Sequence, residues 1–220
     1  MAGRLADLFT DAGLEEVTAA TREAELGTAG EIVPYVVEAC DDYEEAAWKG
    51  AALGAVAAAV LSSLAYWLGG AWGGSPWLWT TLPVVAGAAA GYLVAARPGP
   101  VVRWLSGDEI LELRARRRAL QAFVEEEVFA TRDRTGILLF VAVLERKVVV
   151  LGDAGINSRV EPSEWDEIVA RLTEGLRRGR AAAALAAAVR ASGDLLARHG
   201  VERRSDDADE LANEPRLRER

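Results

Sequence analysis

Residues 50–96 have the sequence GAALGAVAAAVLSSLAYWLGGAWGGSPWLWTTLPVVAGAAAGYLVAA, which contains no charged side chain. A helix needs about 20 apolar residues to cross the hydrocarbon core of a bilayer, so this stretch is long enough for two spans. Glycine and proline concentrate between residues 69 and 76, a composition typical of a turn. The sequence therefore predicts a transmembrane helical hairpin over residues 48–97, with spans at about 49–68 and 77–96.

The alternative is a pair of alanine-rich core helices in a soluble protein. A chain of 220 residues offers little other structure to surround two helices that are apolar on every side. Trp48, Trp67, Trp77 and Trp79 stand near the ends of the predicted spans, where indole rings prefer the headgroup level. These features favour the membrane interpretation. The stretch also begins too far from residue 1 to resemble a signal peptide.

Basic residues flank the hairpin, whereas its connecting turn is uncharged. Because Lys49, Arg97 and Arg103 lie at the outer ends of the spans, the positive-inside rule predicts that both termini face the cytoplasm. We therefore expect a two-span protein of the cell inner membrane. Its expected partners are the lipid bilayer and either another membrane protein or a second copy of the chain. Nucleic acid is not an expected partner, because the formal net charge is −9 and no basic stripe interleaves with aromatic residues.

The sequence outside the hairpin predicts α/β structure. Strands are expected at residues 31–37, 136–143 and 148–151, and helices at 11–27, 107–130, 162–179 and 180–199. A capping-box pattern over residues 106–109 marks the start of the second of these helices, whose inward face is expected to carry Ile110, Leu113, Leu120 and Val124. Pro34 places the first strand at a sheet edge, or else turns its nitrogen outward.

The strands on the two sides of the hairpin are predicted to form one sheet. A single strand before the hairpin cannot bury itself, so residues 1–47 and 98–200 should fold together as one helix-flanked α/β domain. The transmembrane hairpin is then an insertion in that domain. Residues 201–220 are charged and poor in apolar side chains, and are predicted to form a mobile tail.

Two blocks of sequence stand on either side of the predicted hairpin. The first is TAGEIVP at residues 28–34 with CDDY at 40–43, and the second is TRDRTGILLFV at 131–141 with ERKV at 145–148, GDAGI at 152–156 and Trp165. Together they resemble the TPM domain in its membrane-anchored bacterial form. The resemblance implies a helix-flanked sheet (a TPM-like sandwich). Some relatives are described as acid phosphatases of the photosynthetic membrane and others as metal-binding. The resemblance therefore implies the fold more strongly than it implies any one activity.

Carboxylates after two predicted strands are the candidate metal ligands. Asp42 follows the first strand and Asp153 follows the strand at 148–151, and loop oxygens of this kind suit a hard cation such as Ca²⁺ or Mg²⁺. The alternative is that both are ordinary solvated loop acids. Arg132 and Arg134 precede the central strand, where they are expected either to pair within a charged turn or to form an anion clamp beside the carboxylates.

No catalytic residue is predicted. His199, the single histidine, ends a helix, where interaction with the helix dipole accounts for it. Cys40, the single cysteine, cannot form an intramolecular disulfide and is expected to be buried. The sequence shows no nucleophile elbow, phosphate loop or zinc-ligand spacing.

Small residues recur at helical spacing within both predicted spans. Gly50 and Gly54 lie on one face of the first span, and Gly87 and Gly91 on one face of the second. Such faces let helix backbones approach closely in lipid, although the spacing arises easily by chance in alanine-rich sequence. We expect the two faces to pack against each other, or alternatively to form a dimer.

These observations predict a membrane-anchored TPM-like domain that acts as a binding or regulatory module at the cytoplasmic membrane face. The module would depend on a divalent cation if Asp42 and Asp153 form a site. A metal-dependent phosphatase on the same domain and a structural membrane scaffold are the alternatives.

Overall fold

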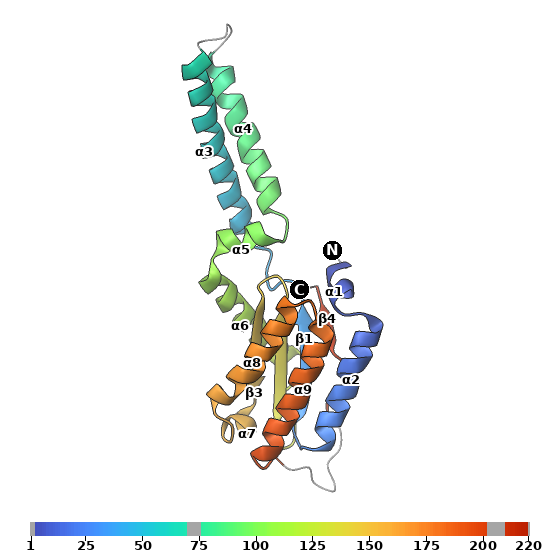
Figure 1. Ribbon diagram of the computed structural model, residues 1–220. Coiled ribbons are helices and arrows are strands. Elements are labelled where there is room, and N and C mark those ends of the chain that lie inside the picture. The colour runs from blue at the N-terminus through green and yellow to red at the C-terminus, as the bar shows by residue number, and fades with distance from the viewer. Residues whose placement is uncertain (1–2, 70–75, 202–209, 220) are drawn as a thin grey trace. The chain divides into compact units, whose positions relative to one another are not determined.

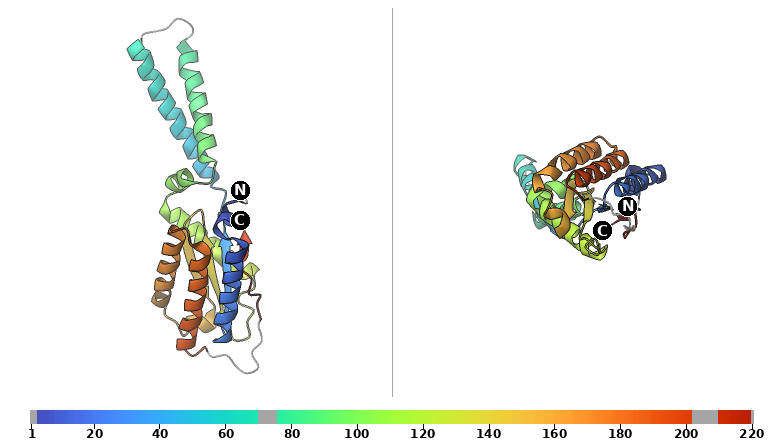
Figure 2. Two further views of the ribbon diagram at one scale, coloured as in Figure 1. Left: turned by 45° about the vertical axis from the view of Figure 1, so that its right-hand side comes forward. Right: turned by 90° about the horizontal axis from the view of Figure 1, so that it is seen from below.

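The structure is a computed structural model that describes residues 3–69, 76–201 and 210–219. The chain divides into two compact units: unit 1 comprises Met1–Cys40 and Glu112–Arg220, and unit 2 comprises Asp41–Leu111. Unit 2 is therefore an insertion in the sequence of unit 1. Figures 1 and 2 show the two units as ribbons.

Unit 1 is built on a four-stranded sheet of order β3-β2-β1-β4. The strands are β1 (Glu31–Val37), β2 (Gly136–Ala142), β3 (Lys147–Gly152) and β4 (Arg216–Arg218). β1 is parallel to both β2 and β4, whereas β3 returns antiparallel to β2. Every residue of β1 and β2 is buried, which explains why both strands are apolar apart from Glu31 at the start of β1.

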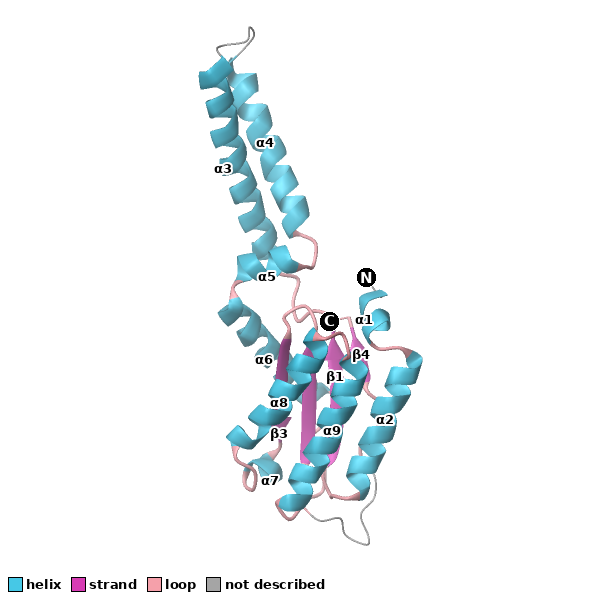
Figure 3. Cartoon of the chain, viewed as in Figure 1, coloured by secondary structure: helices cyan, strands magenta, loops and turns pink. Residues whose placement is uncertain are grey.

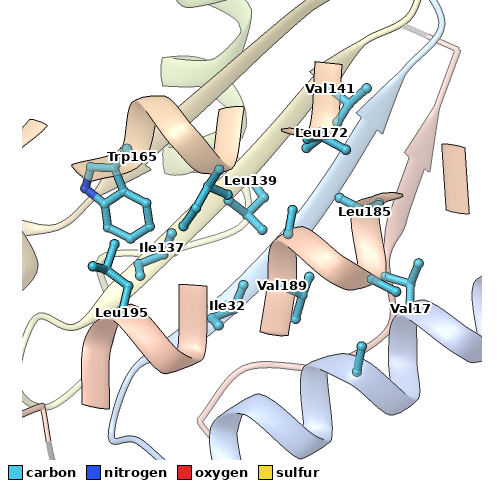
Figure 4. Close-up of a cluster of buried hydrophobic side chains, with 14 of the residues drawn as sticks. Val17, Ile32, Ile137, Leu139, Val141, Trp165, Leu172, Leu185, Val189 and Leu195 are labelled. Carbon is cyan, nitrogen blue, oxygen red and sulfur yellow. The ribbon is translucent and has the colours of Figure 1, made fainter. Parts of the chain in front are cut away.

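Helices cover both faces of this sheet (Figure 3). The helices assigned to unit 1, wholly or in part, are α1 (Gly3–Leu8), α2 (Asp11–Leu26), α6 (Asp108–Glu125), α7 (Ala154–Asn157), α8 (Pro162–Arg177) and α9 (Ala181–Arg198). α2, α8 and α9 cover one face, where Val17, Leu172 and Val189 pack on Ile32 and Leu139 (Figure 4). α6 covers the other face. The mixed α/β class expected from the sequence is confirmed at this level.

α6 turns the opposite face to the sheet from the one predicted. Leu113, Leu120 and Val124 are 56%, 52% and 62% exposed. Ile110, also expected to face inward, is 36% exposed. Buried alanines, at positions 115, 119 and 122, pack instead on a sheet face that includes Tyr35 and Phe140, whose stacked rings lie 5.5 Å apart. Short side chains fit this face because its own side chains already fill the space between helix and sheet.

Pro34 lies in an interior strand of the sheet and not in an edge strand. The amide of Glu31 donates to Thr135 on the β2 side, and that of Glu38 donates to Arg218 on the β4 side. Alternation along the strand places the Pro34 nitrogen on the β4 side. Pairing with β4 begins only at Tyr35, so the donor that proline lacks is not needed.

The predicted mobile tail is corrected over residues 210–219, while residues 202–209 and 220 lie outside the described residues. β4 pairs with Tyr35–Val37, and the carbonyl oxygens of Arg218 and Glu219 accept from the amides of Glu38 and Ala39. The strand alternates charged and apolar side chains, with Leu217 packed against the core. The prediction of a mobile tail rested on the high charge of this segment. A short edge strand can be highly charged, because only one of its residues needs to be apolar and face inward.

Unit 2 consists of two long apolar helices and a short third one. α3 (Glu44–Gly69) and α4 (Pro76–Ala95) are long and apolar enough to cross a membrane, and α5 (Pro100–Ser106) follows them. Trp48 of α3 packs edge-on against Tyr92 of α4 at 5.4 Å between ring centroids. The predicted capping box at Ser106 does not form: this buried residue ends α5, its hydroxyl meets no partner among the described residues, and α6 begins after Gly107, which has a φ of +81°.

Candidate functional site

The strands that precede the two candidate metal ligands, β1 and β3, end at opposite ends of the sheet. Cys40, two residues before Asp42, lies beyond the carboxyl end of β1, where its amide donates to Glu145 at 2.8 Å. Asp153 follows β3, whose last residue Gly152 pairs with Ile137 near the start of β2. Because β3 runs antiparallel to β2, its carboxyl end lies at the other end of the sheet. The predicted metal site required the two strand ends to meet, and the topology separates them by the length of the sheet.

The carboxylate of Asp153 already has structural partners within unit 1. Its Oδ1 accepts Arg134 Nη2 at 3.0 Å and, as the N-cap of α7, the amide of Ala154 at 2.7 Å. Its Oδ2 lies 2.6 Å from Arg134 Nε in an ion pair. Arg134 is itself fixed by a left-handed backbone, with φ of +58°, and its carbonyl oxygen accepts from Gly155. This ion pair, with its one charge-assisted hydrogen bond, joins the loop before β2 to the loop after β3.

The remaining predicted site residues are also separated. Asp42 is exposed, and its amide donates to the side chain of Asp41 at 2.7 Å. The Arg132 amide donates to both carboxylate oxygens of Glu210, at 3.3 and 3.0 Å, so the loop of Arg132 holds the C-terminal segment. In the part of the chain that the structure describes, no group of three or more His, Cys, Asp or Glu side chains is placed to hold a metal ion.

Sequence analysis missed a polar cluster over Tyr35. The Tyr35 hydroxyl meets Arg118 Nη2 at 2.7 Å, and Glu126 binds Arg216 at 3.0 Å and Arg218 at 3.2 Å. Burial raises the pKa of the Tyr35 phenol, against an opposing effect of Arg118, and the hydrogen bond to Glu126 raises the pKa of Arg218. Arg216 and Arg218 lie two residues apart and so share one side of β4. This spacing is the feature of the sequence that could have indicated the cluster.

His199, at the C-terminal end of α9, pairs with a carboxylate in the first turn of α8. Its Nε2 lies 2.8 Å from Oε1 of Glu164, and Oε2 of Glu164 accepts the amide of Glu161 at 3.0 Å in the capping box of α8. Both hydrogen bonds, that of His199 first, hold the pKa of Glu164 below its ordinary value of 4.5.

Glu164→Gln should reduce the acid sensitivity of the fold. A carboxyl whose pKa is lowered by folding stabilises the protein above its unfolded pKa, and this contribution is lost as pH falls through the lowered value. We expect the urea midpoints of the parent to fall more between pH 6 and pH 3.5 than those of Glu164→Gln. Equal declines in the two proteins would contradict the assignment.

The four glycines predicted on the helix faces lie together within the hairpin. A Cβ atom added at Gly54 would lie 2.1 Å from the carbonyl oxygen of Gly87, and one added at Gly91 would lie 2.1 Å from that of Gly50. α3 and α4 therefore touch backbone to backbone at these positions, as small residues allow.

Comparison with known proteins bears on unit 1. A family model described as the TPM domain matches residues 105–195. Residues 105–195 are therefore similar to this family. The match includes β2, β3, α7 and α8, and it leaves out β1 and β4, although both of these strands lie in the same sheet as β2 and β3.

One solved structure resembles the whole chain. It is the NMR structure of the BA42 protein from the psychrophilic bacterium Bizionia argentinensis, at a TM-score of 0.57 and 18% identity, covering 95% of this chain and 94% of that one. At this identity the likeness concerns the fold alone. No curated protein matches the sequence.

Proposed function

We propose that this protein is a membrane-anchored binding or regulatory module, in which α3 and α4 cross the cell inner membrane and hold the TPM domain at its cytoplasmic face. The observation that carries the proposal is the exposure of apolar side chains along both helices. Large side chains such as Leu61, Val85 and Leu93 face outward, while the glycine faces are turned to each other. Helices that are apolar on their outer surface need a surrounding apolar phase.

The orientation follows from the charges at the helix ends. Lys49, Arg97 and Arg103 belong to the ends that continue into unit 1, which favours a cytoplasmic position for that unit. Lys49 also donates to the carbonyl oxygen of Leu105 at 2.9 Å, so its charge stays near the end of the hairpin.

Membrane insertion and orientation can be tested with single cysteines in a Cys40→Ala background. A cysteine at Ser75, between the two helices, should react with a membrane-impermeant maleimide added to intact spheroplasts. A cysteine at Ser158, an exposed position of unit 1, should react only after lysis. The protein should also stay with the membrane fraction after an alkaline carbonate wash. Release by carbonate would contradict insertion, and the reverse labelling pattern would contradict the orientation.

A metal-dependent phosphatase on the same domain is the alternative function. It would need a metal-activated water or a nucleophile with its base, and cations to hold the phosphate. In this structure Asp153 is bonded to Arg134 and His199 to Glu164, so these residues support it less well than the binding module. Phosphomonoester hydrolysis by the purified protein with Mg²⁺ or Ca²⁺ would reverse this preference. A structural scaffold would show neither hydrolysis nor ligand binding.

A further inference from the structure

A cavity of about 250 Å³ opens in unit 1 beside the carboxyl end of β2. Leu8 at the end of α1 and Leu176 of α8 give it apolar walls, and Thr173 of α8 adds a hydroxyl. Two exposed arginines complete the lining: Arg146, from the turn between β2 and β3, and Arg177, the last residue of α8. The carboxyl ends of parallel strands are where open α/β sheets bind their ligands.

The two guanidinium groups differ from the other cations of this region. Lys147 is bonded to Glu112, Arg171 to Glu167 and Arg178 to Glu174. Arg146 and Arg177 have no hydrogen-bond or ion-pair partner in the part of the chain described, and the cavity lining contains no acidic residue.

We propose that this cavity binds a phosphate group, held by Arg146 and Arg177 with the Thr173 hydroxyl as a further donor. A guanidinium group donates two parallel hydrogen bonds to the oxygens of a phosphate. Two arginines beside one small cavity therefore suit the binding of a phosphate group. The volume lies below the roughly 300–1,000 Å³ of pockets for larger ligands, so it suits a single phosphate group. The site binds and does not hydrolyse, because its lining offers no carboxylate, imidazole or thiol.

The backbone conformation of Arg146 is consistent with a binding role for its side chain. This residue has a φ of +57°, a left-handed conformation that glycine and asparagine adopt more readily. The turn that carries it is fixed to β1, because the amides of Val143 and Leu144 donate to the carbonyl oxygens of Val37 and Glu38. The chain therefore presents an arginine at a position where the backbone alone would favour glycine.

Phosphate can reach this cavity from two sources, a soluble anion or an anionic lipid headgroup. Glu145 accepts the amide of Cys40, where the chain leaves unit 1, and Lys147 binds Glu112, where it returns. Arg146 stands between these two residues, at the edge of the unit from which both connections to the hairpin depart. The lipid source rests on the proposed membrane insertion, whereas the soluble source does not.

One effect opposes binding. The cavity adjoins the C-terminal end of α8, where the helix dipole disfavours an anion. The two guanidinium groups must outweigh it, and for this reason we expect the affinity to depend on both of them together.

The test uses the full-length protein in a neutral detergent, with binding measured by calorimetry. The probes are inorganic phosphate at constant ionic strength and dihexanoyl phosphatidic acid, with dihexanoyl phosphatidylcholine as the zwitterionic control. Arg146→Asn combined with Arg177→Gln removes both guanidinium groups, and asparagine suits the left-handed position. Arg171→Gln combined with Arg178→Gln is the matched control, because it removes two charges from α8 and its C-cap, outside the proposed pair. Circular dichroism and thermal melting establish that each variant is folded.

We expect binding of at least one phosphate probe, weakened at least tenfold in the Arg146/Arg177 variant and less than twofold in the control variant. Binding of inorganic phosphate would assign the soluble source, and binding of the lipid alone would assign the headgroup. The proposal is overturned if neither probe binds, or if binding survives loss of both arginines in a folded protein. Membrane insertion is decided separately by the carbonate wash and cysteine labelling, so either proposal can fail without the other.

Discussion

Gly54→Leu should separate α3 from α4 and lower the thermal stability of the full-length protein in detergent. A side chain at this position would place its Cβ 2.1 Å from the carbonyl oxygen of Gly87 and 2.9 Å from its carbonyl carbon. These atoms belong to backbone and cannot rotate away, so the helices themselves must move. Overpacking costs about 1–3 kcal/mol where side chains can adjust, and we expect about 3 kcal/mol or more here.

The same contact explains which partner the glycine faces use. Gly50 and Gly54 of α3 lie against Gly91 and Gly87 of α4 within one chain. A dimer formed through these faces would require the hairpin to open first. We therefore expect Gly54→Leu to change the melting of the hairpin without converting a dimer to a monomer.

Ala57→Leu provides the control for Gly54→Leu, because Ala57 lies on the exposed side of α3. It adds a similar apolar group where lipid or detergent can accommodate it. Thermal melting of both variants, followed by circular dichroism, separates a packing effect from an effect of composition. Equal melting temperatures for Gly54→Leu and Ala57→Leu would show that the glycine contact does not stabilise the hairpin.

The elements of the sheet were predictable where the sequence pattern was strong. The strand predicted at 31–37 coincides with β1, and the one predicted at 136–143 contains all of β2 and one residue more, because strands buried on both faces leave a nearly continuous apolar signature. The face of α6 was not predictable by the same rule. Burial there depends on the fit of short side chains to Tyr35 and Phe140, which lie in other elements, so large apolar residues at helical spacing pointed to the wrong face.

The candidate site failed for a topological reason. Asp42 and Asp153 each follow a strand, as expected, but the direction of β3 relative to β2 decides whether two strand ends meet. The connection between the strands predicted at 136–143 and 148–151 is too short for a parallel crossover, so it already required β3 to be antiparallel. By contrast, the cavity at Arg146 and Arg177 joins α1, the end of β2 and α8. No spacing within one element could have indicated it.

Removal of residues 210–220 should destabilise unit 1 by about 3 kcal/mol, although the segment is highly charged. Glu31, buried at the start of β1, accepts the amides of Glu210 and Leu211 at 3.3 Å each. Hydrogen bonds to charged groups contribute about 1.5–3 kcal/mol, and the pairing of β4 with β1 adds to this. The urea midpoint of a chain ended at Asp209 measures the loss.

A graded pair of point variants tests whether the Glu31 contact anchors the segment. Glu31→Gln keeps the shape of the side chain and removes its charge, so we expect a smaller loss than truncation, on the order of 1–2 kcal/mol. Glu214→Gln removes another acid of the same segment, whose ion pair with Arg22 spans 3.8 Å and is exposed to solvent. We expect this substitution to change the free energy of unfolding very little.

Hydrogen exchange distinguishes a docked segment from one that only adds length to the chain. The amides of Glu38 and Ala39 donate to the carbonyl oxygens of Arg218 and Glu219, so truncation removes their acceptors while the rest of β1 stays bonded to β2. We therefore expect these two amides to lose protection in the truncated chain, and the amides of Val33 and Tyr35, which alternation directs toward β2, to keep it. If Glu38 and Ala39 exchange equally fast in both chains, β4 does not close the sheet in solution, and residues 210–219 belong to the tail that the sequence first indicated.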